Sequence, residues 1–352
     1  MTLTAREAPA PPDVSLVLVA HRSSEVLPAA VDSFRREAAA LGLAAEVVVV
    51  EHSEDAAEAE RVAASSPDVL LVRPNRGYAA GVNAGLAVAR SGLLLVGNPD
   101  VELLAGSLRP LLAALDGDAE VAAPQLRLGS TLFPPAEAQT PMAELRRRRA
   151  GRSRRAWERH LRRELREWDR VWTSAGPVVV PALSGALLAF RRELAARLGP
   201  WDEAYFLYFE ETDWLRRARR QGARLAVVPR APAVHRWGHS APPEEWEEGF
   251  AASQRRFYRK GFGRWRSRVL DVSRRLPMLE RWPPVLAQRA DRWLLSPSPA
   301  GFPAALVEAG TLVEEAARGF CDASGRAAVT LVGIDASHAF LGPYAWQPKM
   351  RA

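Results

Sequence analysis

One acidic motif follows a run of apolar residues. Asp100 closes the sequence Asn98-Pro99-Asp100, directly after the apolar segment 92–96. A carboxylate at the end of a buried strand suits Mg²⁺ or Mn²⁺, which take one or two protein carboxylates and complete their shell with phosphate oxygens. Asn-Pro-Asp is also favourable turn chemistry. The motif alone therefore leaves a metal site and a simple turn both open.

A second acidic cluster sits among aromatic residues. The segment 201–217 reads WDEAYFLYFEETDWLRR, and Glu210, Glu211 and Asp213 fall in the first turn of a predicted helix over 210–221. Acids there stabilise the helix dipole. An apolar wall also raises the pKa of a carboxyl group toward the range of a general base. Helical spacing puts Glu210 and Asp213 on one face and Glu211 about 100° away, so only one face can point at a substrate.

A glycine-rich loop and a late histidine complete the candidates. The loop 75–85, NRGYAAGVNAG, carries Gly77 and Gly81, which permit either a tight turn or close approach of the backbone to a ligand. His235 follows a predicted strand and a proline-rich stretch. A single histidine is usually structural, and it becomes a candidate metal ligand only if the fold brings it near Asp100.

These residues are positioned by alternating strands and helices. Short apolar runs at 14–20, 45–50, 69–72 and 92–96 alternate with helical segments, which predicts βαβ units and a parallel sheet. Ligands bind such sheets beyond the carboxyl ends of the strands. The residues that follow the strands include His21, Glu51, Asn98 and Asp100. Strands are also predicted at 183–190 and 225–228, and a helix at 191–198.

Composition narrows the class of protein. The 352 residues are 48% hydrophobic and 25% charged, with one cysteine, Cys321, which excludes a disordered chain and a disulfide scaffold. No apolar run approaches the ~20 residues that span a bilayer. The lone cysteine favours a cytoplasmic location, and residues 1–13 are expected to be a flexible lead.

Positive charge is concentrated in two segments. The formal net charge is +7, yet 144–170 and 251–293 together hold 24 of the 48 basic residues and 8 of the 41 acidic ones. The rest of the chain is therefore acidic. Basic helices that carry tryptophan favour an anionic membrane surface, although a solvated face or an oligomer interface explains them equally well. No nucleic-acid recognition motif is present, so no nucleic-acid partner is expected.

The order of the motifs resembles the inverting glycosyltransferases of family 2, and most closely the bacterial rhamnosyltransferase-like enzymes of cell-surface polysaccharide assembly. The matching segments cover roughly residues 14–240. They are Ala20-His21-Arg22, Glu51-His52-Ser53, Asn75 to Asn83, Asn98-Pro99-Asp100, Ser184-Gly185-Ala186, Trp201-Asp202-Glu203, Phe206 to Asp213, and His235 to Ser240.

The resemblance implies the α/β GT-A fold over 14–242, with the basic insert 144–170. The sequence pattern beyond it predicts a mainly helical region over 243–352 that holds one small strand near 327–334. The resemblance also implies a nucleotide-sugar donor, a divalent metal (Mg or Mn), and a glycan or polyprenyl-diphosphate-linked acceptor, at the inner face of the cell membrane. The implied roles are catalysis for Glu211 and Asp213, metal binding for Asp100 and His235, donor binding for His21, Glu51, Gly77, Asn83, Asn98 and Asp100, and the acceptor side for Gly185, Trp201 and Asp202.

Four positions depart from the family pattern: Arg22 and His52 stand where Asn is usual, and two further changes bear on function. Glu51 stands where the family has the Asp that reads the donor's base, and Glu211 stands where it has the catalytic Asp. These changes keep open a non-catalytic GT-A scaffold of a glycan assembly complex. A nucleotidyltransferase is disfavoured, because the sequence lacks a glycine-rich, lysine-containing loop near its N-terminus.

Overall fold

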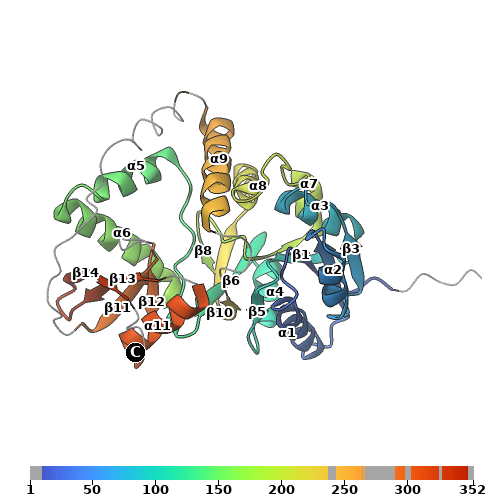
Figure 1. The fold of residues 1–352 in the computed structure, drawn as a ribbon, viewed down its shortest axis with the longest axis horizontal. Helices are drawn as coiled ribbons and strands as arrows, with labels where there is room; N and C mark the ends of the chain where they lie inside the picture. The colour runs from blue at the N-terminus through green and yellow to red at the C-terminus, as the bar shows by residue number, and fades with distance from the viewer. Residues whose placement is uncertain are drawn as a thin grey trace, which may run out of the picture.

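The computed structural model describes residues 10–236, 243–263, 265, 290–297, 303–324 and 327–347. Figure 1 shows their helices and strands. In chain order these are β1 (Val14–Ala20), α1 (Leu27–Ala39), β2 (Ala45–Glu51), α2 (Ala56–Ala63), β3 (Val69–Val72), α3 (Tyr78–Val88), β4 (Leu93–Gly97), β5 (Val101–Leu103), α4 (Leu108–Asp116), β6 (Val121–Leu128), β7 (Thr131–Leu132), α5 (Pro141–Ala150), α6 (Arg154–Trp172), β8 (Val178–Val179), β9 (Leu187–Arg191), α7 (Arg192–Leu198), α8 (Glu210–Arg220), β10 (Leu225–His235), α9 (Pro243–Phe262), β11 (Arg292–Ser296), β12 (Ala305–Val307), α11 (Val313–Ser324), β13 (Val329–Ile334) and β14 (Phe340–Trp346).

The central sheet is mostly parallel, as the sequence predicts. Strands β3, β2, β1 and β4 pair in parallel in that order. Strand β9 then pairs antiparallel with both β4 and β6, and β10 pairs in parallel with β6. Six of these seven strands therefore run in one direction, and their carboxyl ends meet at one edge of the sheet.

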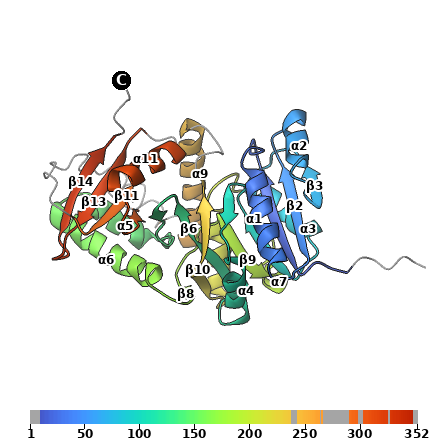
Figure 2. The ribbon, with the colours of Figure 1, turned by 90° about the horizontal axis from the view of Figure 1, so that it is seen from below.

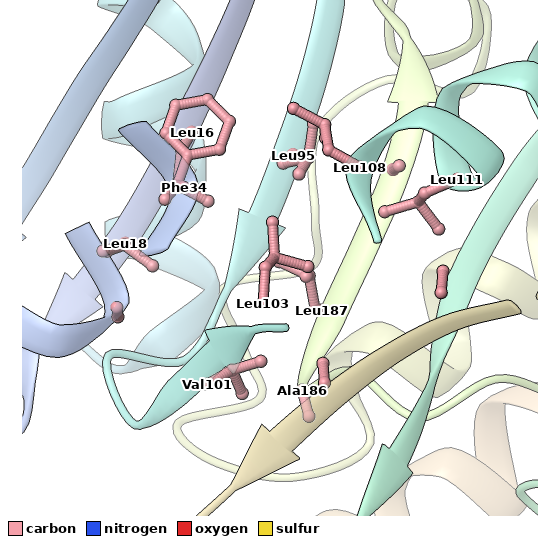
Figure 3. Packing of buried hydrophobic residues seen from close by; sticks show 14 of the residues in the cluster. Leu16, Leu18, Phe34, Leu95, Val101, Leu103, Leu108, Leu111, Ala186 and Leu187 are labelled. Atoms are coloured by element: carbon pink, nitrogen blue, oxygen red, sulfur yellow. The ribbon is translucent and has the colours of Figure 1, made fainter. Parts of the chain in front are cut away.

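Strand β1 contributes side chains to two hydrophobic cores, because successive side chains of a strand point to opposite faces of the sheet. Leu16 and Leu18 pack with Phe34 of α1 on one face, in the cluster drawn in Figure 3. Val17 and Val19 pack with Val82 of α3 on the other face, together with residues of α7 and α8. All seven residues of β1 are buried, which explains why six of them are apolar; the one polar residue, Ser15, donates a hydrogen bond to Glu46 at 2.6 Å.

Strand β10 is longer than predicted. The sequence predicts a strand over 225–228 followed by a proline-rich loop, whereas the strand continues to His235. Its pairing with β6 shifts between Val228 and Pro232, so a bulge absorbs the prolines without ending the strand. As a result, His235 lies on the sheet.

The region after residue 290 is an extension of the central sheet. The strand predicted near 327–334 is present as β13, but β11, β12 and β14 accompany it. Strand β12 pairs antiparallel with β7, which joins these strands to β6. The prediction of a single strand in a mainly helical region was therefore wrong for the described residues, which hold four strands beside α9 and α11. Figures 1 and 2 show this extension on the opposite side of the molecule from β1–β3.

The basic insert 144–170 forms the helices α5 and α6, and α6 has a covered face. Trp157, Leu161 and Trp168 are buried in one cluster with Val332 and Phe340 of the C-terminal strands. The Arg154 guanidinium donates a hydrogen bond to the Phe340 carbonyl at 2.6 Å. The apolar face of α6 is thus occupied by the protein itself.

Several sequence predictions concern residues outside the described ranges. These are most of the lead 1–13, the end of the His235–Ser240 motif, and residues 264 and 266–289 of the second basic segment. Cys321 lies on α11 and is buried. Within the described residues, no helix is both long enough and apolar enough to cross a bilayer.

Candidate active site

The fold brings His235 to Asp100. Asp100 follows β4 and immediately precedes β5, and β5 pairs antiparallel with the end of β10 so that Val101 lies opposite His235. The His235 Nε2 atom is 3.4 Å from the Asp100 Oδ1 atom. Both side chains are largely buried, with 12% and 5% of their surface exposed. The condition under which His235 is a candidate metal ligand is therefore met.

Two residues with a strained backbone set the direction in which α8 begins. Tyr208 and Phe209 have φ values of 69° and 70°, a left-handed conformation that costs non-glycine residues about 1–3 kcal/mol. The chain thereby turns sharply, and Glu210 and Glu211 begin the helix side by side. Such strain is concentrated at functional sites.

Glu211 lies over Gly185. A Cβ atom on Gly185 would be 2.6 Å from the Glu211 Cγ atom, so only glycine leaves room for this side chain. The Thr212 hydroxyl donates a hydrogen bond to Glu211 Oε1 at 3.0 Å. Burial raises the pKa of Glu211, and burial together with the charge of Glu211 raises the pKa of Glu210 well above its usual range. A carboxyl group with a raised pKa is suited to general-base chemistry.

Glu210, Glu211 and His235 line one cavity of about 970 Å³. Tyr78, Asn98 and Gly185 also line it. Its outer walls come from the loop 133–140, from α9 and from the C-terminal extension. Those wall residues include Phe133, Pro134, Glu137, Phe250, Phe257, Leu295, Pro303, Ala305 and Phe320.

The sequence matches the family model described as "Glycosyltransferase like family 2" over residues 11–263. The chain belongs to this family. The matched range runs from β1 to α9 and contains the cavity's acidic groups, whereas β11–β14 lie beyond it. A search of curated proteins found no match.

Solved glycosyltransferase structures resemble the fold. The mannosyltransferase PcManGT from Pyrobaculum calidifontis, in complex with GDP-Man and Mn²⁺, is 16% identical, with 75% of this chain and 74% of that chain covered and a TM-score of 0.48. GalNAc-T7 with UDP, GalNAc and Mn²⁺ is 13% identical (95% and 69% covered, TM-score 0.45), and TarS 1-349 from S. aureus is 14% identical (67% and 63% covered, TM-score 0.39). At these identities the likeness concerns the fold alone.

In this family 2 glycosyltransferase, Asp213 is engaged by a lysine. The Lys260 Nζ atom of α9 lies 2.7 Å from Asp213 Oδ2 and 2.8 Å from Asp202 Oδ2. Asp213 is 2% exposed, and Arg217 adds a second cation at 3.4 Å. This geometry gives Asp213 and Asp202 a structural role in holding α9 beside α8, and the catalytic role of Asp213 and the acceptor contact of Asp202 stay predictions.

Asn83 and Trp201 form a clamp between α3 and the segment before α8. The Asn83 side chain donates to the Trp201 carbonyl at 3.0 Å and accepts from the Trp201 N–H at 2.9 Å. Trp201 is 1% exposed and stacks on Trp214. The Asn83 amide and the Trp201 main chain form this clamp, which gives both residues a structural role, and the donor contact of Asn83 and the acceptor contact of Trp201 stay predictions.

Gly77 is required by a close approach of two backbones. Its φ is 92°, and a Cβ atom there would be 2.4 Å from the Phe206 carbonyl oxygen. The next N–H, that of Tyr78, donates to this oxygen at 2.8 Å. Gly77 therefore holds the segment 205–208 in place, in contrast to the predicted contact with a donor phosphate.

Two residues predicted to bind the donor, His21 and Glu51, lie at the carboxyl ends of β1 and β2. Glu51 is 1% exposed, and its carboxylate accepts a hydrogen bond from the Ser53 N–H. Its Oε2 atom is buried without a partner among the described residues. The adjacent His52 has a lowered pKa because of burial and the nearby charge of His21. Glu51 thus keeps one acceptor oxygen available for a ligand.

Three residues of the site were not assigned a role from the sequence. Tyr78 and Glu210 line the cavity, and Lys260 joins the two aspartates. Lys260 carried a signal, because it is one of only two lysines in an arginine-rich chain. The position of Tyr78 depends on the close approach of Gly77 to Phe206, which sequence spacing does not reveal.

Proposed function

We propose that this protein transfers a sugar from a nucleotide-diphosphate sugar to a hydroxyl group, with inversion at the anomeric carbon. The observation that carries the proposal is the position of Glu211. Its carboxyl group lies over Gly185 in a cavity that His235 also lines, and His235 is 3.4 Å from Asp100. A base and a cation-binding pair thus share one site, as a displacement at the anomeric carbon requires.

Glu211 is the proposed general base. Its carboxylate takes the proton of the acceptor hydroxyl, and the acceptor oxygen attacks the anomeric carbon from the face opposite the diphosphate. A new carbon–oxygen bond forms as the bond to the diphosphate breaks, which inverts the configuration. Glu211 must be ionised to act, and burial raises its pKa. We therefore expect transfer to increase with pH until this group is deprotonated.

Asp100 and His235 are the proposed holders of a divalent ion. Within the described residues no three His, Cys, Asp or Glu side chains form a metal cluster. One carboxylate and one imidazole nevertheless fit an Mg²⁺ or Mn²⁺ whose remaining ligands are diphosphate oxygens. When bound, the ion would neutralise charge on the leaving diphosphate.

The motifs also support a proposal for how the donor is bound and for what the acceptor is. The free Oε2 of Glu51 would accept a hydrogen bond from the donor's base, beside His21, and Asn98 would contact the diphosphate. The motif order favours a rhamnosyltransferase-like enzyme of cell-surface polysaccharide biosynthesis. Its acceptor would be a glycan or a saccharide on polyprenyl diphosphate, and the enzyme would sit peripherally on an anionic membrane.

Donor binding can be tested by thermal stabilisation. UDP-, dTDP- and GDP-sugars are each added with Mn²⁺, and a bound donor raises the melting temperature. Asp100→Ala should abolish the Mn²⁺-dependent part of this shift. An unchanged shift would contradict the metal role of Asp100.

Turnover separates an enzyme from a scaffold. Glu211→Gln should keep donor binding and lower transfer by about 10²-fold or more, because it removes the base alone. Full transfer by this variant would show that another group is the base. A wild-type protein that binds a donor but shows neither transfer nor metal-dependent donor hydrolysis would instead support the scaffold.

A further inference from the structure

One face of α8 lines the cavity from the first turn of the helix to the last. The residues of this face recur at intervals of three to four positions, as one side of a helix requires. They are Glu211, Thr212, Leu215, Arg216, Arg219 and Arg220. Each residue advances a helix by about 1.5 Å, so Arg219 and Arg220 lie about 12–14 Å from Glu211 along the axis. The cavity therefore joins the proposed base to three arginines at the other end of the helix.

The arginine end of this face has no balancing carboxylate. Among the described residues, Arg216, Arg219 and Arg220 form no ion pair. The carboxylates in the described part of the cavity wall are Glu137, Glu210 and Glu211. Glu137 is ion-paired with Arg147, and the other two lie in the first turn of α8. Uncompensated positive charge is thus concentrated where the last turn of α8 meets the cavity.

Arg216 and Arg220 repel each other. They are four residues apart on α8, a spacing at which two like charges destabilise a helix. Burial and the charge of Arg220 lower the pKa of the Arg216 guanidinium. An anion bound between the two side chains would remove this repulsion.

Two of the three guanidinium groups are already held in place. Arg216 donates a hydrogen bond to the Gly261 carbonyl, and its Cζ atom lies 4.6 Å from the centre of the Phe262 ring. Arg219 donates to the Pro181 carbonyl at 2.9 Å. A guanidinium carries five N–H donors, so both side chains keep donors for a ligand. Arg220 forms no hydrogen bond with a described residue.

Stabilisation of the helix dipole does not account for these three arginines. Cations near the carboxyl end of a helix are favourable, and Arg217 is one of them. Arg217 does not line the cavity, and it donates to the Leu198 and Pro200 carbonyls at 2.5 and 2.7 Å. The other three arginines instead share the face that carries Glu211.

We propose that the acceptor carries a phosphate or diphosphate group, which Arg216, Arg219 and Arg220 bind. Guanidinium groups match phosphate oxygens in bidentate pairs, and a group with two or more negative charges balances three arginines better than one carboxylate does. The reacting hydroxyl lies at Glu211, two turns of α8 away, so it belongs to a different part of the acceptor from the phosphate. This inference rests on the proposed function, and it excludes the neutral glycan that the proposed function leaves open.

The test measures binding of farnesyl diphosphate and of inorganic diphosphate by calorimetry, with farnesol as the uncharged probe. EDTA is present, so that no divalent ion occupies the proposed metal site. The double variant Arg219→Gln with Arg220→Gln is compared with Arg191→Gln with Arg224→Gln. The two control arginines are also exposed, are ion-paired to aspartates at the surface, and do not line the cavity.

The wild-type protein should bind diphosphate, and the Arg219/Arg220 variant should bind it about tenfold more weakly or worse, while the control variant should match the wild type. A loss for both diphosphate probes supports a site for the diphosphate itself. A loss for farnesyl diphosphate alone supports a site for a diphosphate on an apolar chain. Unchanged affinity in the Arg219/Arg220 variant, an equal loss in the control, or farnesol binding as tight as that of farnesyl diphosphate would overturn the inference.

Donor binding separates this inference from the proposed function. The Arg219/Arg220 variant should keep the Mn²⁺-dependent thermal stabilisation by a nucleotide sugar, which also shows that the variant is folded. If the wild-type protein binds no nucleotide sugar, the proposed function fails, whereas a loss of diphosphate binding in the Arg219/Arg220 variant still establishes the anion site.

Discussion

At the scale of single residues, Gly185 sets the position of the proposed base. Gly185→Ala would place a Cβ atom 2.6 Å from Glu211 Cγ and push the carboxyl group aside. We expect transfer to fall by about 10²-fold, since misplacing a catalytic group by about an ångström has this effect. Donor affinity should change little. The matched control is Gly176→Ala, where a Cβ atom meets nothing within 4 Å. Unchanged kcat in Gly185→Ala would contradict this account.

Glu210 links the site to stability. Its pKa is raised in the folded protein, so the folded state holds a proton that the unfolded state has lost. The free energy of unfolding therefore falls as pH rises from the ordinary glutamate pKa through the raised one. Glu210→Gln should reduce this dependence, since Glu211 with its own raised pKa contributes the remainder, and should stabilise the protein by about 1–2 kcal/mol at high pH. Urea unfolding at pH 5 and pH 8 checks it, and a wild-type protein that is equally stable at both pH values would argue against it.

At the scale of elements, α9 is attached to α8 through Lys260. Lys260→Met would leave the buried Asp213 carboxylate beside Arg217, whose Nε atom is 3.4 Å away. We expect the free energy of unfolding, measured in urea, to fall by about 1–3 kcal/mol. The double variant Lys260→Met with Asp213→Asn should recover most of the loss, because it removes the buried charge as well. Arg259→Met, at an exposed position of the same helix, is the control. Additive effects of the two substitutions would show that this pair does not couple the helices.

Most of the family 2 region was predictable because its elements are local. The six apolar residues of β1 and the first-turn acids of α8 mark their elements in the sequence itself. The sequence alone could not predict that His235 lies beside Asp100, because this proximity depends on β10 continuing past its prolines. The engagement of Asp213 by Lys260 and the exposure of Tyr78 to the cavity depend on tertiary contacts. Helical periodicity does not encode such contacts.

At the scale of the whole molecule, half of the basic residues lie in two segments, 144–170 and 251–293. On α6 exposed arginines lie at helical spacing opposite the buried face: Arg155, Arg159, Arg166 and Arg170. Arg162, also exposed, instead donates a hydrogen bond to the His338 carbonyl and lies over the Phe340 ring of β14. Trp265, just beyond α9, is 76% exposed. Because the apolar face of α6 is covered, any membrane contact through this helix is electrostatic.

Liposome flotation tests this contact. The protein should float with vesicles that contain phosphatidylserine, remain unbound with pure phosphatidylcholine, and detach at high salt. Changing Arg155, Arg159 and Arg166 to Gln should lower binding by at least tenfold, at about 1 kcal/mol for each arginine. Arg35→Gln, on α1, is the single-site control. Equal flotation with neutral and anionic vesicles would rule out the electrostatic contact.

The pairing of β12 with β7 also sets an order of events in folding. Arg127 beside β7 and Glu308 beside β12 form an ion pair across 181 residues of sequence. Contacts so distant along a chain form slowly, because a long loop must close first. The sheet β1–β4 can assemble from neighbouring segments, whereas the cavity wall formed by Leu295, Ala305 and Phe320 waits for this closure. During refolding, completion of this cavity wall should therefore lag behind the appearance of the N-terminal core.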